Sequence, residues 1–401
     1  MNDTTSSPRE VPKDHRKVAA ILQWLRAHDL ESVASALVEI SGFDATFDQE
    51  SATLDKALDL WFSETAKSKS QEIFSLPRAG KRVQSDPELH IEDQLIGNPT
   101  SISWRRVGSN ICSEDFVVGV ATREVVTFRG VAQCQSYGAI SPVLSVDWCN
   151  ERILVSCMGG EVSILKAETL EPILHLKPHG NSHVHGAFNE PGNFFYTFGR
   201  DKTFAVHELV GQAEAVLLHV FRFRKNVTAA CWTGEKTLAV CVEDSDTILF
   251  LKVDSQAIGR MRGDEYATSH MNMSIKDSST FCPSSIAAFG DFVAVVTSST
   301  TALLFIIGFD SPIRSYYGCW GGPLDRSTVC FSSDGSHIYL GGGTGNFNVF
   351  QTDSEHKVDV IEAHSQCLRS MTSCRWTGRL ATVSFDKSIK VFREDVDSIQ
   401  S

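Results

Sequence analysis

The sequence lacks several features that assign a chain to a common functional class. Its 11 cysteines include no Cys-x-x-Cys pair, which excludes the usual zinc-finger and redox motifs. The longest apolar run, 302–309, is far shorter than the roughly 20 residues of a membrane-spanning helix. The first ten residues contain no apolar signal core. We therefore expect a reducing compartment, cytoplasmic or nuclear, and no contact with a membrane.

The sequence also lacks an excess of positive charge. Its formal net charge is −12 at pH 7, whereas a nucleic-acid-binding protein needs a basic stripe for the phosphates. Two short basic segments occur, at 221–225 and 78–82, and solvated surface explains both more simply. We expect no direct contact with nucleic acid.

Catalytic and ligand-binding motifs are missing as well. The sequence has no Gly-x-Ser-x-Gly, no His-Glu-x-x-His and no paired-carboxylate arrangement. His183 and His185 share one face of a predicted strand close to His179 and could bind a metal, but a loop histidine followed by two strand histidines is the simpler interpretation. We expect no catalytic residue, no cofactor and no metal.

The first part of the chain has helical periodicity. Residues 1–13 are polar, without a period, and are predicted to be a disordered tail. Residues 14–70 contain three short helical patterns, and residues 71–87 carry prolines and charge and are predicted to be a linker. Helices of this size bury little apolar surface by themselves, so this region is expected to self-associate.

The rest of the chain, residues 88–396, is strand-like and repetitive, and residues 397–401 form a polar tail. In six of the units an aromatic residue ends one strand, with successive spacings of 44, 40, 44, 57 and 42 residues. These residues are Trp104, Trp148, Phe188, Trp232, Phe289 and Phe331. A period of 40–45 residues with four strands per unit is typical of a β-propeller. The long spacing is attributed to an inserted loop at 254–283.

The last unit resembles a WD repeat, and residues 90–393 resemble a seven-bladed WD-repeat propeller. Here His364 precedes the first strand, Ser384 lies on the second, Asp386 lies in the turn and Phe392 takes the place of the closing Trp. The resemblance implies a buried polar chain in which Asp386 accepts a hydrogen bond from His364, whose ring lies against the Ser384 hydroxyl.

Other units depart from this family pattern. The third unit has His179 and Asp201, but Gly199 stands at the expected hydroxyl position and His207 at the expected Trp position. The first, second and sixth units have Thr122, Gly159 and Thr344 where Asp is expected. An eight-bladed count and a kelch-like propeller therefore stay open as alternatives.

The last unit contains three strands and needs a fourth. The segment 88–97, just before the first unit, has apolar Leu89 and Ile91 at alternate positions. We expect this segment to pair with the last unit, close the ring and cover the open sheet edge.

The segment 19–41 resembles a LisH motif. The residue pairs Trp24-Leu25, Asp29-Leu30 and Val33-Ala34, followed by Leu37, correspond to the family pattern, and a generic helical hairpin is the alternative. The fold class that we expect is mainly β, a seven-bladed WD-repeat-like propeller preceded by a small α-helical LisH-like domain. Because LisH units dimerise, we expect a homodimer whose interface contains five apolar residues. These are Ile21, Trp24, Leu25, Leu37 and Trp61.

This layout resembles several families of interaction proteins, among them the dynein-regulating lissencephaly family, transcriptional co-repressor subunits and ubiquitin-ligase subunits. We expect a non-catalytic scaffold or adaptor that binds other proteins, including members of a large complex, through its propeller. The alternatives are a co-repressor or ubiquitin-ligase subunit of the same layout, or a hydrolase that uses the propeller channel.

The LisH resemblance predicts that Leu25→Asp separates the dimer, because the substitution would bury a charge without a partner. Light scattering on the full-length chain should show the mass of a dimer for the unsubstituted protein and of a monomer for the variant. A monomeric unsubstituted chain at micromolar concentration would contradict the LisH interpretation.

Overall fold

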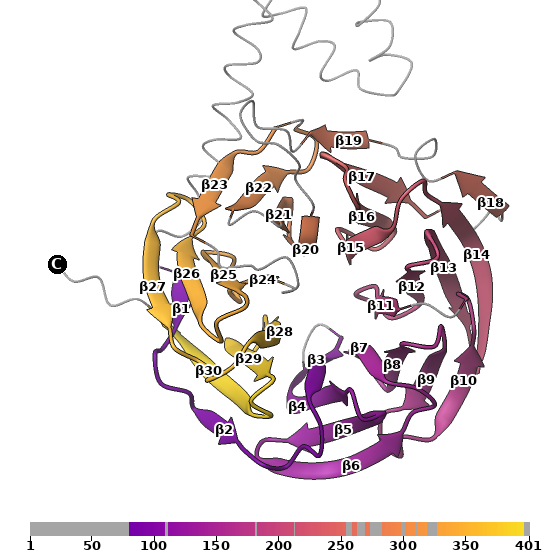
Figure 1. Cartoon of the computed structure of the whole chain (residues 1–401), viewed down its shortest axis with the longest axis horizontal. Coiled ribbons are helices and arrows are strands. Elements are labelled where there is room, and N and C mark those ends of the chain that lie inside the picture. The colour runs from indigo at the N-terminus through magenta and orange to yellow at the C-terminus, as the bar shows by residue number, and fades with distance from the viewer. Residues whose placement is uncertain are drawn as a thin grey trace, which may run out of the picture. The chain divides into compact units, whose positions relative to one another are not determined.

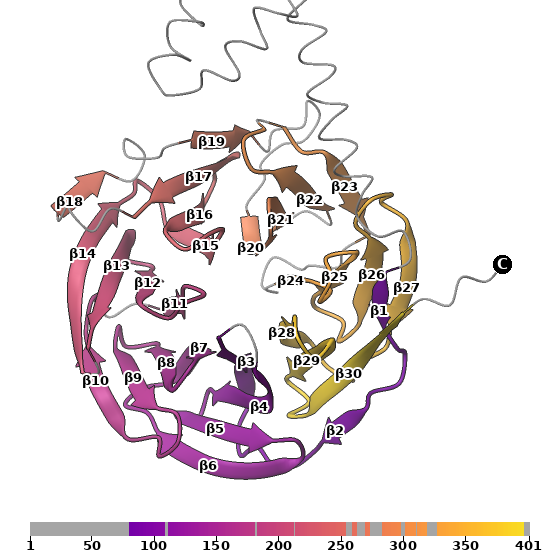
Figure 2. The same ribbon diagram turned by 180° about the vertical axis from the view of Figure 1, so that it is seen from behind.

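A ring of seven antiparallel β-meanders makes up the described part of the chain (Figures 1 and 2). The computed structural model describes residues 80–396, apart from 109–110, 181–182, 212, 254–258, 263–268, 273–282, 298–300, 310 and 319–326. The chain divides into two units, Met1–Leu76 and Pro77–Ser401, and every described residue belongs to the second. The prediction of a seven-bladed propeller is confirmed. The helices expected at 14–70 lie outside the described residues.

Each blade begins with a strand near the centre of the ring and proceeds outward. The strands of blades one to three are β3 (Pro99–Val107), β4 (Ile111–Val120), β5 (Glu124–Arg129), β6 (Ala132–Gly138), β7 (Val143–Cys149), β8 (Arg152–Cys157), β9 (Val162–Lys166), β10 (Pro172–Leu176), β11 (Val184–Phe188), β12 (Phe194–Gly199), β13 (Thr203–Val210) and β14 (Glu214–Arg222).

The strands of blades four to six are β15 (Val227–Trp232), β16 (Thr237–Val242), β17 (Thr247–Lys252), β19 (Ser269–Asn272), β20 (Pro283–Phe289), β21 (Phe292–Thr297), β22 (Thr301–Ile306), β23 (Arg314–Tyr317), β24 (Thr328–Phe331), β25 (His337–Gly341), β26 (Phe347–Gln351) and β27 (Lys357–Ile361). Blade seven contains β28 (Leu368–Cys374), β29 (Arg379–Ser384) and β30 (Ile389–Val396) from the end of the chain.

The middle strands are apolar without alternation because neighbouring blades cover both of their faces. All six residues of β12 are buried, as are five of the six residues of β8. The outer strand β6, by contrast, is polar and almost wholly exposed. Each hydrophobic cluster therefore lies between two blades; one, for example, joins Phe204 of blade three to Leu251 of blade four.

Side chains connect the innermost strands of neighbouring blades. The backbone N–H of Trp148 donates to Ser103 Oγ at 3.2 Å, and the N–H of Phe188 donates to Asp147 Oδ2 at 2.8 Å. Between the last and first blades, Ile102 N donates to Ser370 Oγ at 3.4 Å. These serine and aspartate side chains thus accept hydrogen bonds from N–H groups that face the neighbouring blade and would otherwise be unpaired.

Two N-terminal strands close the ring. β2 (Leu89–Ile91) pairs antiparallel with the first half of β30, with Ile91 opposite Ile389. β1 (Lys81–Val83) pairs with the second half of the same strand, with Val83 opposite Glu394. β2 lies within the segment that the sequence analysis expects to close the ring. β1 lies within residues 71–87, so the described end of that predicted linker is a propeller strand.

The inserted segment 254–283 contributes to the sheets and is more than a loop. β19 pairs with β17 and is the outer strand of blade four. β18 (Gly259–Arg262) pairs parallel with β14 and adds a fifth strand to blade three. Turn-like composition hid both strands from the sequence analysis, because four-residue strands carry little periodicity.

The closure predicts unequal effects for two isoleucines that lie close together in the sequence. Ile91 is 2% exposed and packs in the cluster between blades seven and one, whereas Ile96 is 80% exposed. Ile91→Ala should lower the free energy of unfolding by about 3 kcal/mol, because it leaves a cavity at the closing seam. Ile96→Ala is the matched control and should change it by less than about 0.5 kcal/mol. Equal denaturant midpoints for the two variants would contradict this account of the seam.

Candidate functional site

His364 and Asp386 form the polar centre of blade seven. His364 Nδ1 lies 3.1 Å from Asp386 Oδ2 and 2.9 Å from Ser388 Oγ. Its Nε2 lies 2.8 Å from Thr382 Oγ1. The hydroxyl against the ring is therefore that of Thr382, and the expected role of Ser384 is wrong. Ser384 Oγ donates to the Gln366 carbonyl at 2.9 Å instead.

Strand geometry explains the correction. Residues two apart on a strand share a face, so Thr382 and Ser384 are both candidates by sequence alone. Only Thr382 lies beside the ring, while Ser384 is at the strand end, where its Oγ accepts a hydrogen bond from Asp386 N at 3.2 Å. Ser384 thus stabilises the turn and does not contact the histidine.

Blade three repeats this chain with the same spacings. His179 Nδ1 lies 3.1 Å from Asp201 Oδ1, and His179 Nε2 lies 3.0 Å from Thr197 Oγ1. In both blades the threonine follows the histidine by 18 residues and the aspartate follows it by 22. The glycine at 199 therefore interrupts nothing, and the shared 18-residue spacing is the signal that could have identified the hydroxyl.

Burial sets the protonation of these groups. It lowers the pKa of His364 to about 4, against the opposing effect of the Asp386 carboxylate. Burial also lowers the pKa of His207, which stacks on the Phe195 ring with centroids 4.7 Å apart, to about 4. Burial by itself would raise the pKa of Asp201, but hydrogen bonds from His179 and Thr203 outweigh it and lower that pKa to about 2. His364 and His207 are therefore neutral at pH 7. His364 is a hydrogen-bonded core group, and His207 packs in the core against an aromatic ring.

The residues predicted at the dimer interface all lie in the first unit of the chain. Ile21, Trp24, Leu25, Leu37 and Trp61 are outside the described residues, and the dimer stays a prediction.

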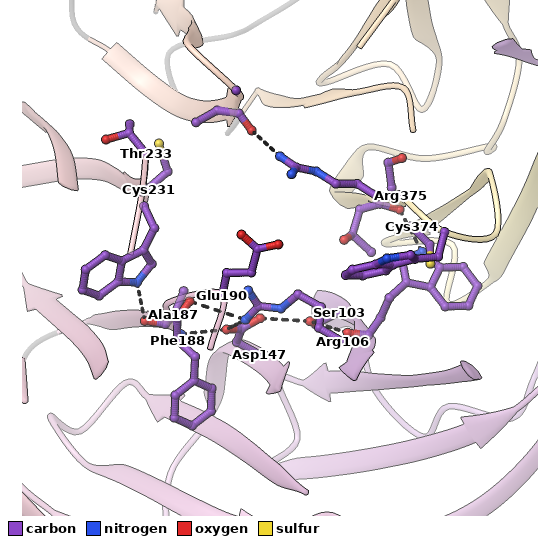
Figure 3. Close-up of a pocket in the computed structure, with 18 of the residues that line it drawn as sticks. Ser103, Arg106, Asp147, Ala187, Phe188, Glu190, Cys231, Thr233, Cys374 and Arg375 are labelled. Carbon is purple, nitrogen blue, oxygen red and sulfur yellow. Dashed lines mark hydrogen bonds and ion pairs between the residues drawn. The ribbon is translucent and has the colours of Figure 1, made fainter. Parts of the chain in front are cut away.

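A pocket of about 430 Å³ lies where the inner strands end, and we call it the mouth pocket (Figure 3). Six inner strands contribute to it: β3, β7, β11, β15, β20 and β28. Its lining residues are Ser103, Trp104, Arg106, Asp147, Ala187, Phe188, Glu190, Tyr196, Cys231, Trp232, Thr233, Gly234, Ala288, Gly290, Thr372, Ser373, Cys374, Arg375 and Trp376. His364 and His179 precede their inner strands, so the polar chains lie at the opposite face of the ring.

An ion pair between Arg106 and Asp147 forms one wall of the mouth pocket. Asp147 Oδ1 also accepts a hydrogen bond from Ser103 Oγ at 3.1 Å, and Oδ2 accepts one from Phe188 N at 2.8 Å. Burial by itself would lower the pKa of Arg106, but Asp147 and other negative groups nearby outweigh it and raise that pKa. Both charges are thus stabilised by neighbouring blades and serve as fixed parts of the wall.

Aromatic side chains donate hydrogen bonds to three backbone carbonyls around the mouth pocket. Trp104 Nε1 donates to the Thr372 carbonyl and Trp232 Nε1 donates to the Ala187 carbonyl, both at 3.1 Å. Tyr196 Oη donates to the Ala230 carbonyl at 2.6 Å. With their N–H and O–H groups engaged, these side chains offer the pocket their ring surfaces.

Glu190 extends into the open centre of the mouth pocket (Figure 3). It is exposed and forms no ion pair within the described residues. Arg375, across the pocket, lies with its guanidinium carbon 4.7 Å from the centre of the Phe289 ring and donates to the Ala288 carbonyl at 3.5 Å. The Cys231 thiol nearby is protonated at neutral pH, because burial raises its pKa to about 12.

Nothing in the sequence pattern predicts this pocket. Trp104, Phe188 and Trp232 mark the repeat, although their position at strand ends also places them around the central channel. The charged residues came from irregular positions, such as Glu190 in the turn after β11, that no repeat pattern marks. Among the described residues, no group of three His, Cys, Asp or Glu is arranged to hold a metal ion.

A comparison with known protein families finds no match to this chain, and a comparison with curated proteins finds no similar sequence. In the part of the chain that the structure describes, no helix has the length and apolarity needed to cross a membrane.

The buried histidines predict a stability that falls in mild acid. Because the folded-state pKa of His364 is about 4, below the ordinary 6.5, its contribution is complete above pH 6.5 and is lost as the pH falls towards 4. Between pH 7 and pH 5 this one group should cost about 2 kcal/mol. His364→Gln should be less stable at pH 7 but should lose correspondingly less stability on going to pH 5. Urea denaturation at both values measures the difference.

The matched control for that experiment is His356→Gln, because His356 is an exposed histidine in the turn before β27. It should keep the pH dependence of the unsubstituted protein. If His364→Gln kept it too, the buried ring would not be the group that titrates.

Proposed function

We propose that the protein is a non-catalytic adaptor that binds other proteins at the mouth pocket of a WD-repeat-type propeller. The observation that carries this proposal is the mouth pocket itself, an aromatic and charged recess built on strands from six blades. Rigid strands hold its walls, and the turns after them supply the side chains that meet solvent. Binding surfaces commonly have this arrangement of variable turns on a rigid scaffold.

The state of the ionisable groups supports binding in preference to chemistry. Arg106 and Asp147 are paired with each other, and Cys231 is a protonated thiol. General acid–base or nucleophilic catalysis needs a group with a pKa near the working pH or an activated nucleophile. Paired charges and half-buried aromatic rings suit recognition of a partner chain, which is why the adaptor is favoured over a channel hydrolase.

The repeated polar chain supports the WD-repeat interpretation. His364, Asp386 and Thr382 of blade seven have counterparts at equal spacings in blade three, as expected for a repeat that ties a loop to a turn. The N-terminal helices are proposed to dimerise as a LisH unit. Two propellers on one dimer would then bind a repeated or dimeric partner more tightly than either alone, without additional contacts.

Filling the mouth pocket should remove the partner. Gly234 lines the pocket, and a Cβ placed on it would have no atom within 4 Å, so Gly234→Trp should fold and obstruct the opening. The full-length chain, carrying an affinity tag in its source cells, should co-purify a near-stoichiometric protein that Gly234→Trp fails to retain. Quantitative mass spectrometry of the two preparations measures this.

The control is Gly180→Trp, since Gly180 also has open space around its Cβ position but lies in the loop before β11, at the opposite face. It should retain the partner. Retention by both variants would show that proteins bind elsewhere on the chain, and the proposal of a mouth-directed adaptor would be wrong.

A further inference from the structure

We propose that the mouth pocket recognises a basic side chain of the partner, best an arginine, through Glu190 and the faces of Trp232 and Trp376. This inference rests on the proposed function, since it names the chemistry of the segment that an adaptor would bind there. It follows from an account of which polar groups in the pocket already have partners.

The cations of the pocket are occupied. Arg106 is paired with Asp147 and also donates to the Phe188 carbonyl at 3.5 Å. Arg375 stacks on Phe289 and donates to a carbonyl of blade five. An acidic ligand would have to compete with these contacts.

Three carbonyl groups at the pocket wall are occupied as well. Those of Thr372, Ala187 and Ala230 each accept a hydrogen bond from an aromatic side chain at the pocket wall. A ligand that depended on donating to the backbone here would displace an indole or a phenol. At these three points the wall offers an incoming group side-chain surface and no free carbonyl.

Among the described residues that line the pocket, Glu190 is the acidic group without an ion-pair partner. Its carboxylate is directed into the centre of the pocket (Figure 3). Arg106 is close enough for Glu190 to raise its pKa, but the Arg106 guanidinium is already ion-paired with Asp147. An exposed carboxylate at the centre of a concave site is placed to accept hydrogen bonds from a cation.

Two indole rings also line the pocket. Trp232 and Trp376 are both half-buried pocket residues, and the described residues place no cation over either ring. The electron-rich face of an indole attracts a cation that is positioned above it. Arginine suits such a site better than lysine, because its planar guanidinium can stack on a ring and still donate two parallel hydrogen bonds to a carboxylate.

The charge of the whole chain acts in the same direction. The formal net charge is −12 at pH 7, so the surrounding field attracts a basic segment and repels an acidic one. The proposed occupant is therefore an extended or loop segment of another protein that inserts one arginine, and an acidic or purely apolar segment is the outcome that would speak against it.

The test selects peptides from a random phage-displayed library on the full-length protein and sorts them by their response to substitutions. Peptides that Gly234→Trp no longer binds are the mouth-directed class. These should be enriched in arginine, and Glu190→Gln should weaken them about tenfold by isothermal titration calorimetry, the effect of losing one charge-assisted contact in a partly dry site. Replacing the peptide arginine with citrulline, its neutral isostere, should cause a similar loss, and replacement with lysine a smaller one.

The matched control is Glu235→Gln, which removes the same charge from the turn after β15 at the same face without lining the pocket. It should leave the affinity within about twofold. Because Glu190 and Glu235 are both exposed, both variants should melt like the unsubstituted protein.

The outcomes separate this inference from the proposed function. Mouth-directed peptides that lack a basic residue, or that bind Glu190→Gln with unchanged affinity, would show that the pocket does not recognise arginine. The proposed adaptor function would be unaffected by that result. A selection that yields no peptide sensitive to Gly234→Trp would overturn the mouth pocket as a protein-binding site altogether.

Discussion

The pairing of β30 with β1 and β2 is the contact on which the rest of the propeller depends. Without these N-terminal strands, β30 would expose a full row of unpaired N–H and C=O groups at the edge of blade seven. The seam also extends beyond backbone pairing. Asp334 of blade six accepts a hydrogen bond from the Lys81 N–H at 2.8 Å, and the buried Glu394 accepts one from the Ser333 N–H at 2.9 Å. The closing strands thus bind blade six and blade seven together.

The mouth pocket inherits this dependence. One of its walls comes from the first blade and another from the last, and Trp104 joins them through its hydrogen bond to the Thr372 carbonyl. These residues are far apart in the sequence and meet only when the ring is closed. Any loosening of the seam therefore reaches the pocket directly, whereas loosening of an outer strand such as β6 does not. Stability and the binding proposed for the pocket are therefore coupled at this one junction.

The parts of the structure that follow a period could be predicted from the sequence, and the parts that depend on tertiary position could not. Regularly spaced aromatics such as Trp104 and Trp148 predicted the blades, and alternating Leu89 and Ile91 predicted a closing strand. The choice between Thr382 and Ser384 depends on which residue of the strand lies beside the His364 imidazole. No spacing within a single repeat gives that position. The position of Glu190 in the mouth pocket could not be predicted, because five other strands supply the rest of the lining.

The polar chain of blade seven belongs to the same closing mechanism. Asp386 accepts hydrogen bonds from both the N–H and the hydroxyl of Ser388, at 3.0 and 2.7 Å, and so fixes the turn between β29 and β30. The next residue, Ile389, is the first of β30 and lies opposite Ile91. A turn held in one conformation sets the register of the strand that follows it. The buried histidine that orients Asp386 therefore acts on ring closure, because it sets where β30 begins and which of its residues meet the N-terminal strand.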